Sequence, residues 1–311
     1  MRTLLCPGQG AQFPGMGREI AERFPAARNV FDRANEALGF DLARILFHGT
    51  EEEVNRTDVC QPGILVVSCA IGRALVDKRI GDPASFACVA GLSLGEYTAH
   101  VFAGSLTFED AVRLVRRRGE YMQDASDAVP SGMAAVMGIE TDAVEKVCAE
   151  IRAGGGVVVV ANLNSPGQVV VSGEKHALAR CGEALTKAGA KRIIPLKVAG
   201  AFHSPVMKPA AALLAADLEA TTFRDPLIPV ISNVAAAPVK TASQAKATLS
   251  RQIVEPVLFE KSLRHVLAAG CRDFVELGPG KTLCAFVKKI DRDAQTTNYD
   301  TVTDVENGVR R

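Results

Sequence analysis

The hydrophobic and polar positions of the chain change between strand-like and helical patterns. Residues 86–90 form a continuous apolar run that is typical of a buried parallel strand, and the run ends at Gly91. Helical periodicity follows over residues 96–102 and again over residues 108–124. The same criteria predict helices over residues 17–38, 62–78 and 259–269, and strands over residues 3–6, 228–232 and 274–277. We therefore predict an α/β core with a parallel sheet.

The pattern of the α/β core is interrupted at Pro130 and resumes near residue 198. Between these points strands and helices are predicted, in the order βαββαβ, over residues 134–137, 141–151, 157–160, 169–171, 174–188 and 192–196. This order is typical of a small ferredoxin-like unit. We predict that residues 130–197 form an inserted subdomain and that residues 1–129 and 198–290 form one discontinuous core. Residues 291–311 are polar and aperiodic, so we expect a poorly ordered tail.

Composition narrows the class of protein. The 311 residues are 48% hydrophobic and 23% charged, with a formal net charge of +1, which favours a soluble globular protein. No broad basic field is present to bind nucleic acid or an anionic membrane. The eight cysteines include no CxxC pair and the five histidines are scattered, so metal-site spacing is absent. We expect buried thiols in a reducing compartment and, because no signal peptide or membrane span is predicted, a cytoplasmic location.

The candidate nucleophile is Ser93. It lies at the centre of the sequence GLSLG (residues 91–95), which fits the Gly-x-Ser-x-Gly pattern between a buried strand and an apolar helix. A sharp turn there would expose the hydroxyl, and the start of the following helix would favour developing negative charge. The alternative is an ordinary tight turn with a structural serine. We predict that Ser93 carries an acyl group as an ester.

A serine hydroxyl needs an adjacent base, and His203 is the best candidate by elimination. Three other histidines, His48, His176 and His265, lie in polar or helical surface contexts. His100 lies on the same predicted helix as Ser93 and about two turns away, too far to take its proton. His203 lies in a loop of small residues between a strand and a helix, where clefts form over open α/β sheets. No acidic residue flanks His203, so a backbone carbonyl could orient it.

Arg118 breaks the amphipathic pattern of its predicted helix. Arg113, Arg116, Arg117 and Glu120 share the polar stripe, whereas Arg118 shares the apolar stripe with Ala111, Leu114, Val115 and Met122. An unpaired buried guanidinium is costly, so Arg118 should meet a carboxylate, for which its planar fork is suited. That carboxylate could belong to an Asp or Glu of the protein or to a substrate.

The chain resembles the malonyl-CoA:acyl-carrier-protein transacylase family and is similar to the acyltransferase domains of fatty-acid and polyketide synthases. The matching segments, spread over residues 3–290, are PGQGAQ (7–12), GLSLGEY (91–97), RGEYMQ (118–123), NLNSPGQ (162–168), GAFHS (200–204), Gln252 and ELGPG (276–280). Each segment is weak alone, but their order is specific. The resemblance implies an α/β-hydrolase-like core with a parallel sheet and an inserted ferredoxin-like subdomain.

The resemblance also implies roles for individual residues. Ser93 would carry the acyl ester, His203 would be the base, and the main-chain carbonyl of Gln252 would orient the imidazole. The backbone N–H groups of Gln9 and Leu94 would form the oxyanion hole.

Two further implied roles concern the acyl group. Arg118 would bind the free malonyl carboxylate, and Phe202 before the histidine fits the malonyl-type pattern.

Two positions depart from the family pattern: Leu92 stands where many members have His, and Glu255 stands where Asn or Ser is frequent and could tune the pocket near Gln252.

The implied reaction is ping-pong transfer of malonyl from malonyl-CoA to the phosphopantetheine thiol of acyl carrier protein, in fatty-acid or polyketide biosynthesis. No cofactor or metal is expected beyond these two substrates, no nucleic acid or membrane partner is expected, and the chain is expected to be a monomer. The alternatives are transfer of another acyl unit, the malonyl-transferring subunit of a malonate-degrading complex, a serine esterase that uses water, and a carrier-binding scaffold without activity.

Overall fold

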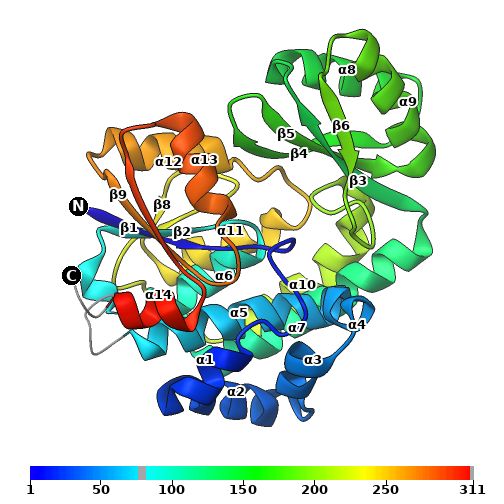
Figure 1. The fold of residues 1–311 in the computed structure, drawn as a ribbon. Helices are drawn as coiled ribbons and strands as arrows, with labels where there is room; N and C mark the ends of the chain where they lie inside the picture. Colours follow the sequence, from blue (N-terminus) through cyan, green and yellow to red (C-terminus); the bar gives the residue numbers. More distant parts are fainter. Residues whose placement is uncertain (76–81, 309–311) are drawn as a thin grey trace.

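Two β-sheets organise the chain. The computed structural model describes residues 1–75 and 82–308, and its larger sheet has the strand order β10-β9-β1-β2-β7-β8 (Figure 1). These strands are β1 (Arg2–Cys6), β2 (Cys88–Gly91), β7 (Val230–Ile231), β8 (Pro238–Val239), β9 (Asp273–Leu277) and β10 (Gln295–Tyr299). All neighbouring pairs are parallel except β7 and β8. The parallel sheet predicted from the apolar runs is therefore confirmed.

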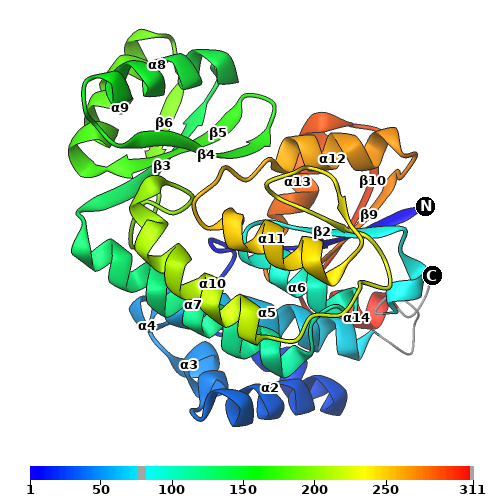
Figure 2. The same ribbon diagram turned by 180° about the vertical axis from the view of Figure 1, so that it is seen from behind.

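Helices cover both faces of this sheet. Leu4, Val89 and Val275 point to one face, where they share an apolar cluster with the N-terminal helices, whereas Leu5 and Phe274 point to the other. The helices of the core are α1 (Arg18–Arg23), α2 (Pro25–Leu38), α3 (Leu42–His48), α4 (Glu51–Asn55), α5 (Thr57–Ala74), α6 (Leu94–Phe102), α7 (Phe108–Ala128), α10 (Lys208–Ala220), α11 (Ala242–Gln252), α12 (Phe259–Ala268) and α13 (Thr282–Ile290). Helices α12 and α13 lie over the second face (Figures 1 and 2). Burial on both faces explains why these strands are continuously apolar.

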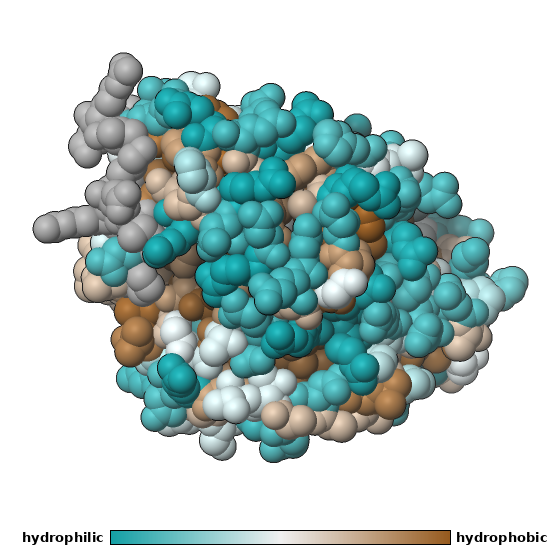
Figure 3. Space-filling model, turned by 90° about the horizontal axis from the view of Figure 1, so that it is seen from below, coloured by the Kyte–Doolittle hydropathy of each residue, from teal (hydrophilic) through white to brown (hydrophobic). Residues whose placement is uncertain are grey.

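The N-terminal helices form the outer layer on the first face. Their apolar side chains point inward; on α2 these are Ala27, Val30, Phe31 and Ala34. Their outer surface is mostly hydrophilic, with hydrophobic side chains only in scattered places (Figure 3). Within residues 1–75 and 82–308, none of the helices combines the length and apolarity that a bilayer crossing requires.

The second sheet belongs to the inserted subdomain. Its strands β3 (Ser131–Met137), β4 (Val158–Ser165), β5 (Gln168–Glu174) and β6 (Arg192–Pro195) pair antiparallel in the order β4-β5-β3-β6. Helices α8 (Thr141–Ala153) and α9 (Lys175–Lys187) pack on one face of it around a core of mostly branched side chains (Figure 1). The predicted βαββαβ order of a ferredoxin-like unit is confirmed, and its strands lie inside the predicted interval 130–197.

Two helices differ from their predicted limits. The helix predicted over residues 17–38 is divided into α1 and α2, because Phe24 is extended and Pro25 begins a new helix. The helix predicted to start at Pro62 instead starts at Thr57, and Pro62 lies inside it. The last residues of that prediction, 76–78, lie outside the described residues.

The prediction of a poorly ordered tail over residues 291–311 is wrong for its described part. Residues Gln295–Tyr299 form β10, which pairs in parallel with β9 along its whole length, and α14 (Val302–Asn307) follows with a capping box at Thr301. A polar strand at the edge of a sheet is held by backbone hydrogen bonds rather than by an apolar pattern, so periodicity could not reveal it. Residues 309–311 lie outside the described residues.

Candidate active site

Ser93 lies in the sharp turn between β2 and α6. Its backbone has φ 52° and ψ −107°, a conformation that non-glycine residues rarely adopt. The flanking glycines are required by close contacts: a Cβ on Gly91 would lie 2.0 Å from the carbonyl carbon of Gly95, and a Cβ on Gly95 would lie 2.1 Å from the Cys6 oxygen. The Gly-x-Ser-x-Gly sequence therefore forms the strand-to-helix turn that the pattern predicts.

The structure brings the predicted nucleophile and base together. Ser93 Oγ lies 2.8 Å from His203 Nε2, and His203 Nδ1 lies 2.7 Å from the main-chain oxygen of Gln252. A carbonyl oxygen only accepts hydrogen bonds, so Nδ1 carries the hydrogen and Nε2 can accept the Ser93 proton. Burial of the ring, together with the nearby charge of Arg118, lowers the pKa of His203 to about 4. The imidazole is therefore neutral at neutral pH, as a general base must be.

Arg118 is almost completely buried, at 1% exposure, next to the serine. Its Nη1 donates to Gln61 Oε1 at 2.6 Å, and its Nη2 donates to Ser93 Oγ at 3.0 Å and to Gln252 Oε1 at 3.2 Å. Its Nε has no hydrogen-bond partner among the described residues, and its Cζ lies 5.4 Å from the centroid of the Tyr97 ring. No carboxylate of residues 1–75 or 82–308 forms an ion pair with it. Two neutral amides therefore hold a cation that forms an ion pair with none of the described carboxylates.

A cavity of about 110 Å³ opens beside these side chains, between the core and the subdomain. Gln9, Ser93, Phe202 and His203 line it from the core, and Asn162 and Asn164 line it from β4. The two units are joined at this place by hydrogen bonds from Leu163 N to Val257 O and from Val257 N to Ala161 O, at 2.9 and 2.8 Å. A small acyl group would fit here, with most of its surface shielded from water.

The two predicted oxyanion donors flank the serine. Leu94 is the first residue of α6, so its N–H has no acceptor within the helix. Gln9 lies in the loop after β1, which contacts the turn closely, since a Cβ on Gly8 would lie 2.2 Å from the Leu92 oxygen. Their role in binding an oxyanion stays a prediction.

The remaining histidines lie apart from this dyad. His48, His176 and His265 are exposed, as predicted. His100 lies on α6, fully buried, and neither ring nitrogen has a hydrogen-bond partner among the described residues. Its ring lies edge-on to that of Phe223, with 6.0 Å between the ring centroids.

Sequence analysis assigned no role to three buried polar residues beside the site. Gln61 accepts from Arg118, and Asn233 contacts the turn at Ser93. Glu96 Oε2 accepts from Gln252 Nε2 at 2.6 Å and from Asn233 N at 3.1 Å, while burial raises the pKa of Glu96 to about 7. Gln61 and Glu96 could have been found in the same way as Arg118, because each is a polar residue in an apolar stretch of a helix. Asn233 follows a short strand, so no helical pattern marks it as a buried polar residue.

The two departures from the family pattern have different surroundings. Leu92 is partly buried and lines the cavity. Glu255 forms a two-point ion pair with Arg251, with both N–O distances 2.7 Å, and does not line the cavity. The Glu255 side chain is thus engaged outside the cavity, but the Glu255 main chain lies against the His203 ring and opposes the fall in its pKa. That Glu255 tunes the pocket stays a prediction.

The sequence of the chain is similar to those of known proteins over most of its length. The family model described as "Acyl transferase domain" matches residues 3–306. The chain is 44% identical over 294 residues to the malonyl CoA-acyl carrier protein transacylase of Bacillus subtilis, covering 94% of this chain and 92% of that protein. The Escherichia coli K12 protein of the same name is 42% identical over 284 residues, with 91% of each chain covered.

Solved structures show the same similarity. The malonyl CoA-acyl carrier protein transacylase of Coxiella burnetii superposes with a TM-score of 0.95 at 34% identity, covering 100% of this chain and 97% of that chain. A malonyl-transacylase in complex with its type II polyketide synthase acyl-carrier protein superposes with a TM-score of 0.93 at 37% identity, with 99% of each chain covered.

Proposed function

The chain belongs to the acyl transferase family, among the malonyl-CoA–acyl carrier protein transacylases. On this premise we propose that Ser93 carries malonyl as an ester while the group passes from the CoA thiol to the phosphopantetheine thiol of acyl carrier protein. The chain is an acyltransferase that moves malonyl groups to acyl carrier protein for fatty-acid biosynthesis. A polyketide pathway is the alternative use of the same product. The observation that carries the proposal is the buried guanidinium of Arg118, which pairs with none of the described carboxylates and whose Nη2 lies 3.0 Å from Ser93 Oγ.

The substrate carboxylate completes the electrostatics of the site. The Arg118 guanidinium is held by the side-chain oxygens of Gln61 and Gln252, which orient it without neutralising it. A malonyl carboxylate would provide the missing negative charge and receive charge-assisted hydrogen bonds. A neutral acyl group would leave the buried cation uncompensated, so the site favours an acyl group with a free carboxylate. Phe202, which lines the cavity, would pack against the acyl chain.

The first half-reaction transfers malonyl to the enzyme. Ser93 Oγ attacks the thioester carbonyl of malonyl-CoA while His203 Nε2 takes the hydroxyl proton. The backbone N–H groups of Gln9 and Leu94 bind the resulting oxyanion, and in such sites the loss of one donor typically costs about 100- to 1000-fold in rate. The carbon–sulfur bond then breaks, and His203 returns the proton to the CoA thiolate.

The second half-reaction reverses these roles. The phosphopantetheine thiol of acyl carrier protein gives its proton to His203 Nε2 and attacks the Ser93 ester. The carbon–oxygen bond breaks, Ser93 Oγ recovers the proton, and malonyl leaves as a thioester of the carrier protein. The carbonyl of Gln252 keeps the imidazole in the tautomer that both halves need. The kinetics are therefore ping-pong, and the scheme requires no cofactor.

The setting of the enzyme is also part of the proposal. All eight cysteines are free and buried, as expected in a reducing compartment, which supports a cytoplasmic location. A monomeric state stays a prediction, which sedimentation equilibrium of the purified chain would test.

Mass spectrometry of the intact protein tests the covalent step. After exposure to malonyl-CoA without carrier protein, we expect one malonyl group per chain in the parent and none in Ser93→Ala. Ser105→Ala is the matched control, because Ser105 is also a buried serine but donates to the carbonyl of Arg224. Malonylation of Ser93→Ala at the parent's level would remove Ser93 from the scheme.

The same samples separate the alternatives. Equal loading from several acyl-CoAs would indicate an enzyme for another acyl unit. Rapid loss of the ester in water alone would indicate an esterase, and no loading at all would indicate an inactive carrier-binding scaffold. Loading that only a malonate-degrading carrier could discharge would indicate the subunit of such a complex.

A further inference from the structure

Asn233 lies directly beyond the sheet, next to the turn that carries Ser93. It follows β7, whose residues Val230 and Ile231 pair in parallel with Val89 and Ala90 of β2. This pairing ends just before the turn, and the backbone groups of the turn therefore need other partners. Asn233 is fully buried, at 0% exposure.

The side chain of Asn233 supplies these partners. Its Oδ1 accepts a hydrogen bond from Ser93 N at 2.6 Å, and its Nδ2 donates one to Gly91 O at 2.6 Å. In a parallel ladder, one residue bonds through its C=O and N–H to two residues on the neighbouring strand, one on each side of its partner. The Asn233 carboxamide therefore makes the two hydrogen bonds that the backbone of one more β7 residue would make. These bonds go to Gly91 and Ser93, the residues on either side of Leu92.

These two bonds, together with the bond from Gln252 Nε2 to the Ser93 carbonyl at 3.0 Å, constrain the backbone of the turn. Ser93 keeps φ 52° and ψ −107° only where the surroundings impose them. That conformation decides where Oγ points, and Oγ must stay 2.8 Å from His203 Nε2. It also directs the N–H of Leu94, the next residue. Since Asn233 occupies the N–H of Ser93 itself, the oxyanion must use other amides, in agreement with Gln9 and Leu94.

Asn233 is itself fixed from two sides. Its N–H donates to the buried carboxyl of Glu96 on α6 at 3.1 Å, and its carbonyl accepts from Leu258 N, before α12, at 2.7 Å. Glu96 also accepts from the side chain of Gln252, whose main-chain oxygen orients His203. Nucleophile, base and Asn233 therefore share one buried hydrogen-bond network.

We propose that Asn233 is a positioning residue for the nucleophile: its carboxamide clamps Gly91 and Ser93 so that the Ser93 hydroxyl and the Leu94 amide stay aligned for acyl transfer. The inference rests on the proposed function of Ser93. It concerns chemistry rather than recognition of malonyl, because Asn233 makes no hydrogen bond to Arg118.

Single-turnover kinetics on the full chain tests the clamp. In Asn233→Ala we expect the rate constant of Ser93 malonylation to fall by about 100-fold, as for small misplacements of reacting groups. The KM for malonyl-CoA should stay within about threefold, because Arg118 is untouched. Acetyl-CoA should lose rate by the same factor. Asn233→Asp should retain more rate than Ala, since a carboxyl group offers the same acceptor and, when protonated, the same donor.

The amplitude of acylation separates positioning from folding. A variant that only folds less well would give a smaller amount of acyl-enzyme with an unchanged rate constant, which would overturn the proposal. Ser105→Ala is the control: Ser105 is also buried, but it donates to the carbonyl of Arg224 and not to the turn or to the segment around Asn233. It should keep the parent's rate constant.

The same two variants distinguish an error about the Asn233 clamp from an error about the role of Ser93. If Asn233→Ala acylates at the parent's rate while Ser93→Ala is not acylated, only the clamp is wrong. If Ser93→Ala is acylated, the ester itself is on another residue.

Discussion

At the scale of single residues, the proposed selectivity of the site depends on what surrounds Arg118. Its guanidinium is bound by two glutamine side chains and by the Ser93 hydroxyl, all neutral. The nearby Glu96 carboxyl contacts Gln252 instead, and burial raises its pKa to about 7. Since none of the described carboxylates contacts Arg118 directly, we propose that a carboxylate arriving with the substrate forms that ion pair.

Replacement of Arg118 should separate malonyl from acetyl transfer. In Arg118→Ala we expect kcat/KM for malonyl-CoA to fall by about 100-fold or more, because a buried charge-assisted pair is lost. Acetyl-CoA, which lacks the carboxylate, should lose far less. Arg117→Ala is the matched control, since Arg117 is exposed on the opposite stripe and pairs with Asp217. Equal losses for both donors would make Arg118 structural.

His100 should make the stability of the protein depend on pH. Burial lowers its pKa from 6.5 to about 3. As the pH falls below 6.5, the unfolded chain takes up a proton at His100 and the folded chain does not, so the free energy of unfolding decreases by about 1.4 kcal/mol per pH unit. His203, with a pKa of about 4, acts in the same direction.

Replacement of His100 tests this dependence. When the pH is lowered from 7.5 to 5, we expect the parent to lose about 2 kcal/mol more free energy of unfolding than His100→Leu loses. Urea titrations of both proteins at both pH values measure this difference. The exposed His176, changed to Gln, provides the comparison and should follow the parent. The same pH dependence in His100→Leu and parent would contradict the assignment.

At the scale of elements, the contact between α5 and α7 positions Arg118 and Gln61. The helices meet at Gly119, where a Cβ would lie 2.7 Å from the Asp58 Cα. Pro62 has no N–H to donate to the Asp58 carbonyl four residues before it, and Arg116 Nη1 donates to that carbonyl instead, at 2.8 Å. A side chain of α7 thus replaces the hydrogen bond that the proline removes from α5.

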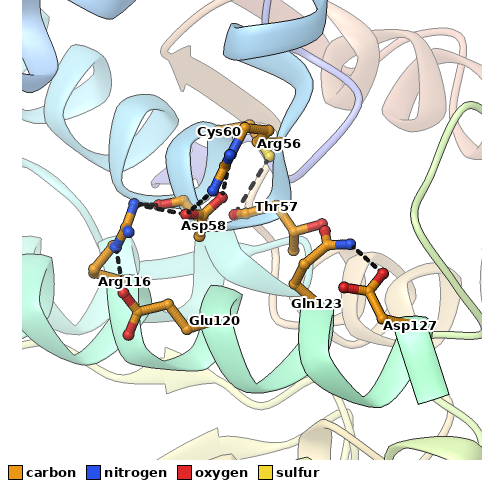
Figure 4. A network of polar contacts seen from close by, with 8 residues as sticks. All are labelled: Arg56, Thr57, Asp58, Cys60, Arg116, Glu120, Gln123 and Asp127. Carbon is orange, nitrogen blue, oxygen red and sulfur yellow. Dashed lines mark hydrogen bonds and ion pairs between the residues drawn. The ribbon is translucent and has the colours of Figure 1, made fainter.

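Asp58 strengthens the same contact (Figure 4). Its carboxylate, at 5% exposure, receives hydrogen bonds from Arg56 and pairs with Arg116 at 2.9 Å. Burial opposes its ionisation, but Arg56 and Arg116 outweigh burial and lower the pKa of Asp58. The ion pairs therefore hold the start of α5 against α7.

Removal of this carboxylate should destabilise the fold. We expect Asp58→Ala to lower the free energy of unfolding by about 2 kcal/mol, because the partly buried Arg116 loses one of its two carboxylate partners and keeps only Glu120. Urea titration measures the loss. Asp127→Ala on α7 removes only an exposed hydrogen bond from Gln123 and should change stability by about 0.5 kcal/mol or less. A similar loss in both variants would show that the Asp58 pairs add nothing.

At the scale of the whole molecule, the C-terminal segment completes the large sheet. β10 covers the edge of β9, and Tyr299 and Val305 are buried against the core. A chain that ends at Ala294 should lose about 5 °C or more in Tm and aggregate through the exposed β9 edge, whereas a chain that ends at Gly308 should not. Thermal unfolding followed by light scattering measures both. Equal Tm values would mean that β10 contributes no stability.

Local patterns in the sequence determined most of the architecture and three side chains of the site. Strand and helix periods act over a few neighbouring residues, so the parallel sheet and the βαββαβ insertion were predictable. The glycines around Ser93 encode a turn that only small residues can form, and Arg118 stood out as a cation on an apolar stripe. His203 was found by elimination among five histidines, and only the resemblance pointed to the carbonyl of Gln252.

The tertiary structure alone decided the parts that depend on distant partners. Asn233 bonds to Ser93 from 140 residues away, and a backbone carbonyl such as that of Gln252 has no side-chain signature. The strand β10 is polar and exists because β9 offers it a row of backbone partners. Such features depend on which groups three-dimensional packing brings together, and a periodic pattern carries information only about the face of its own element.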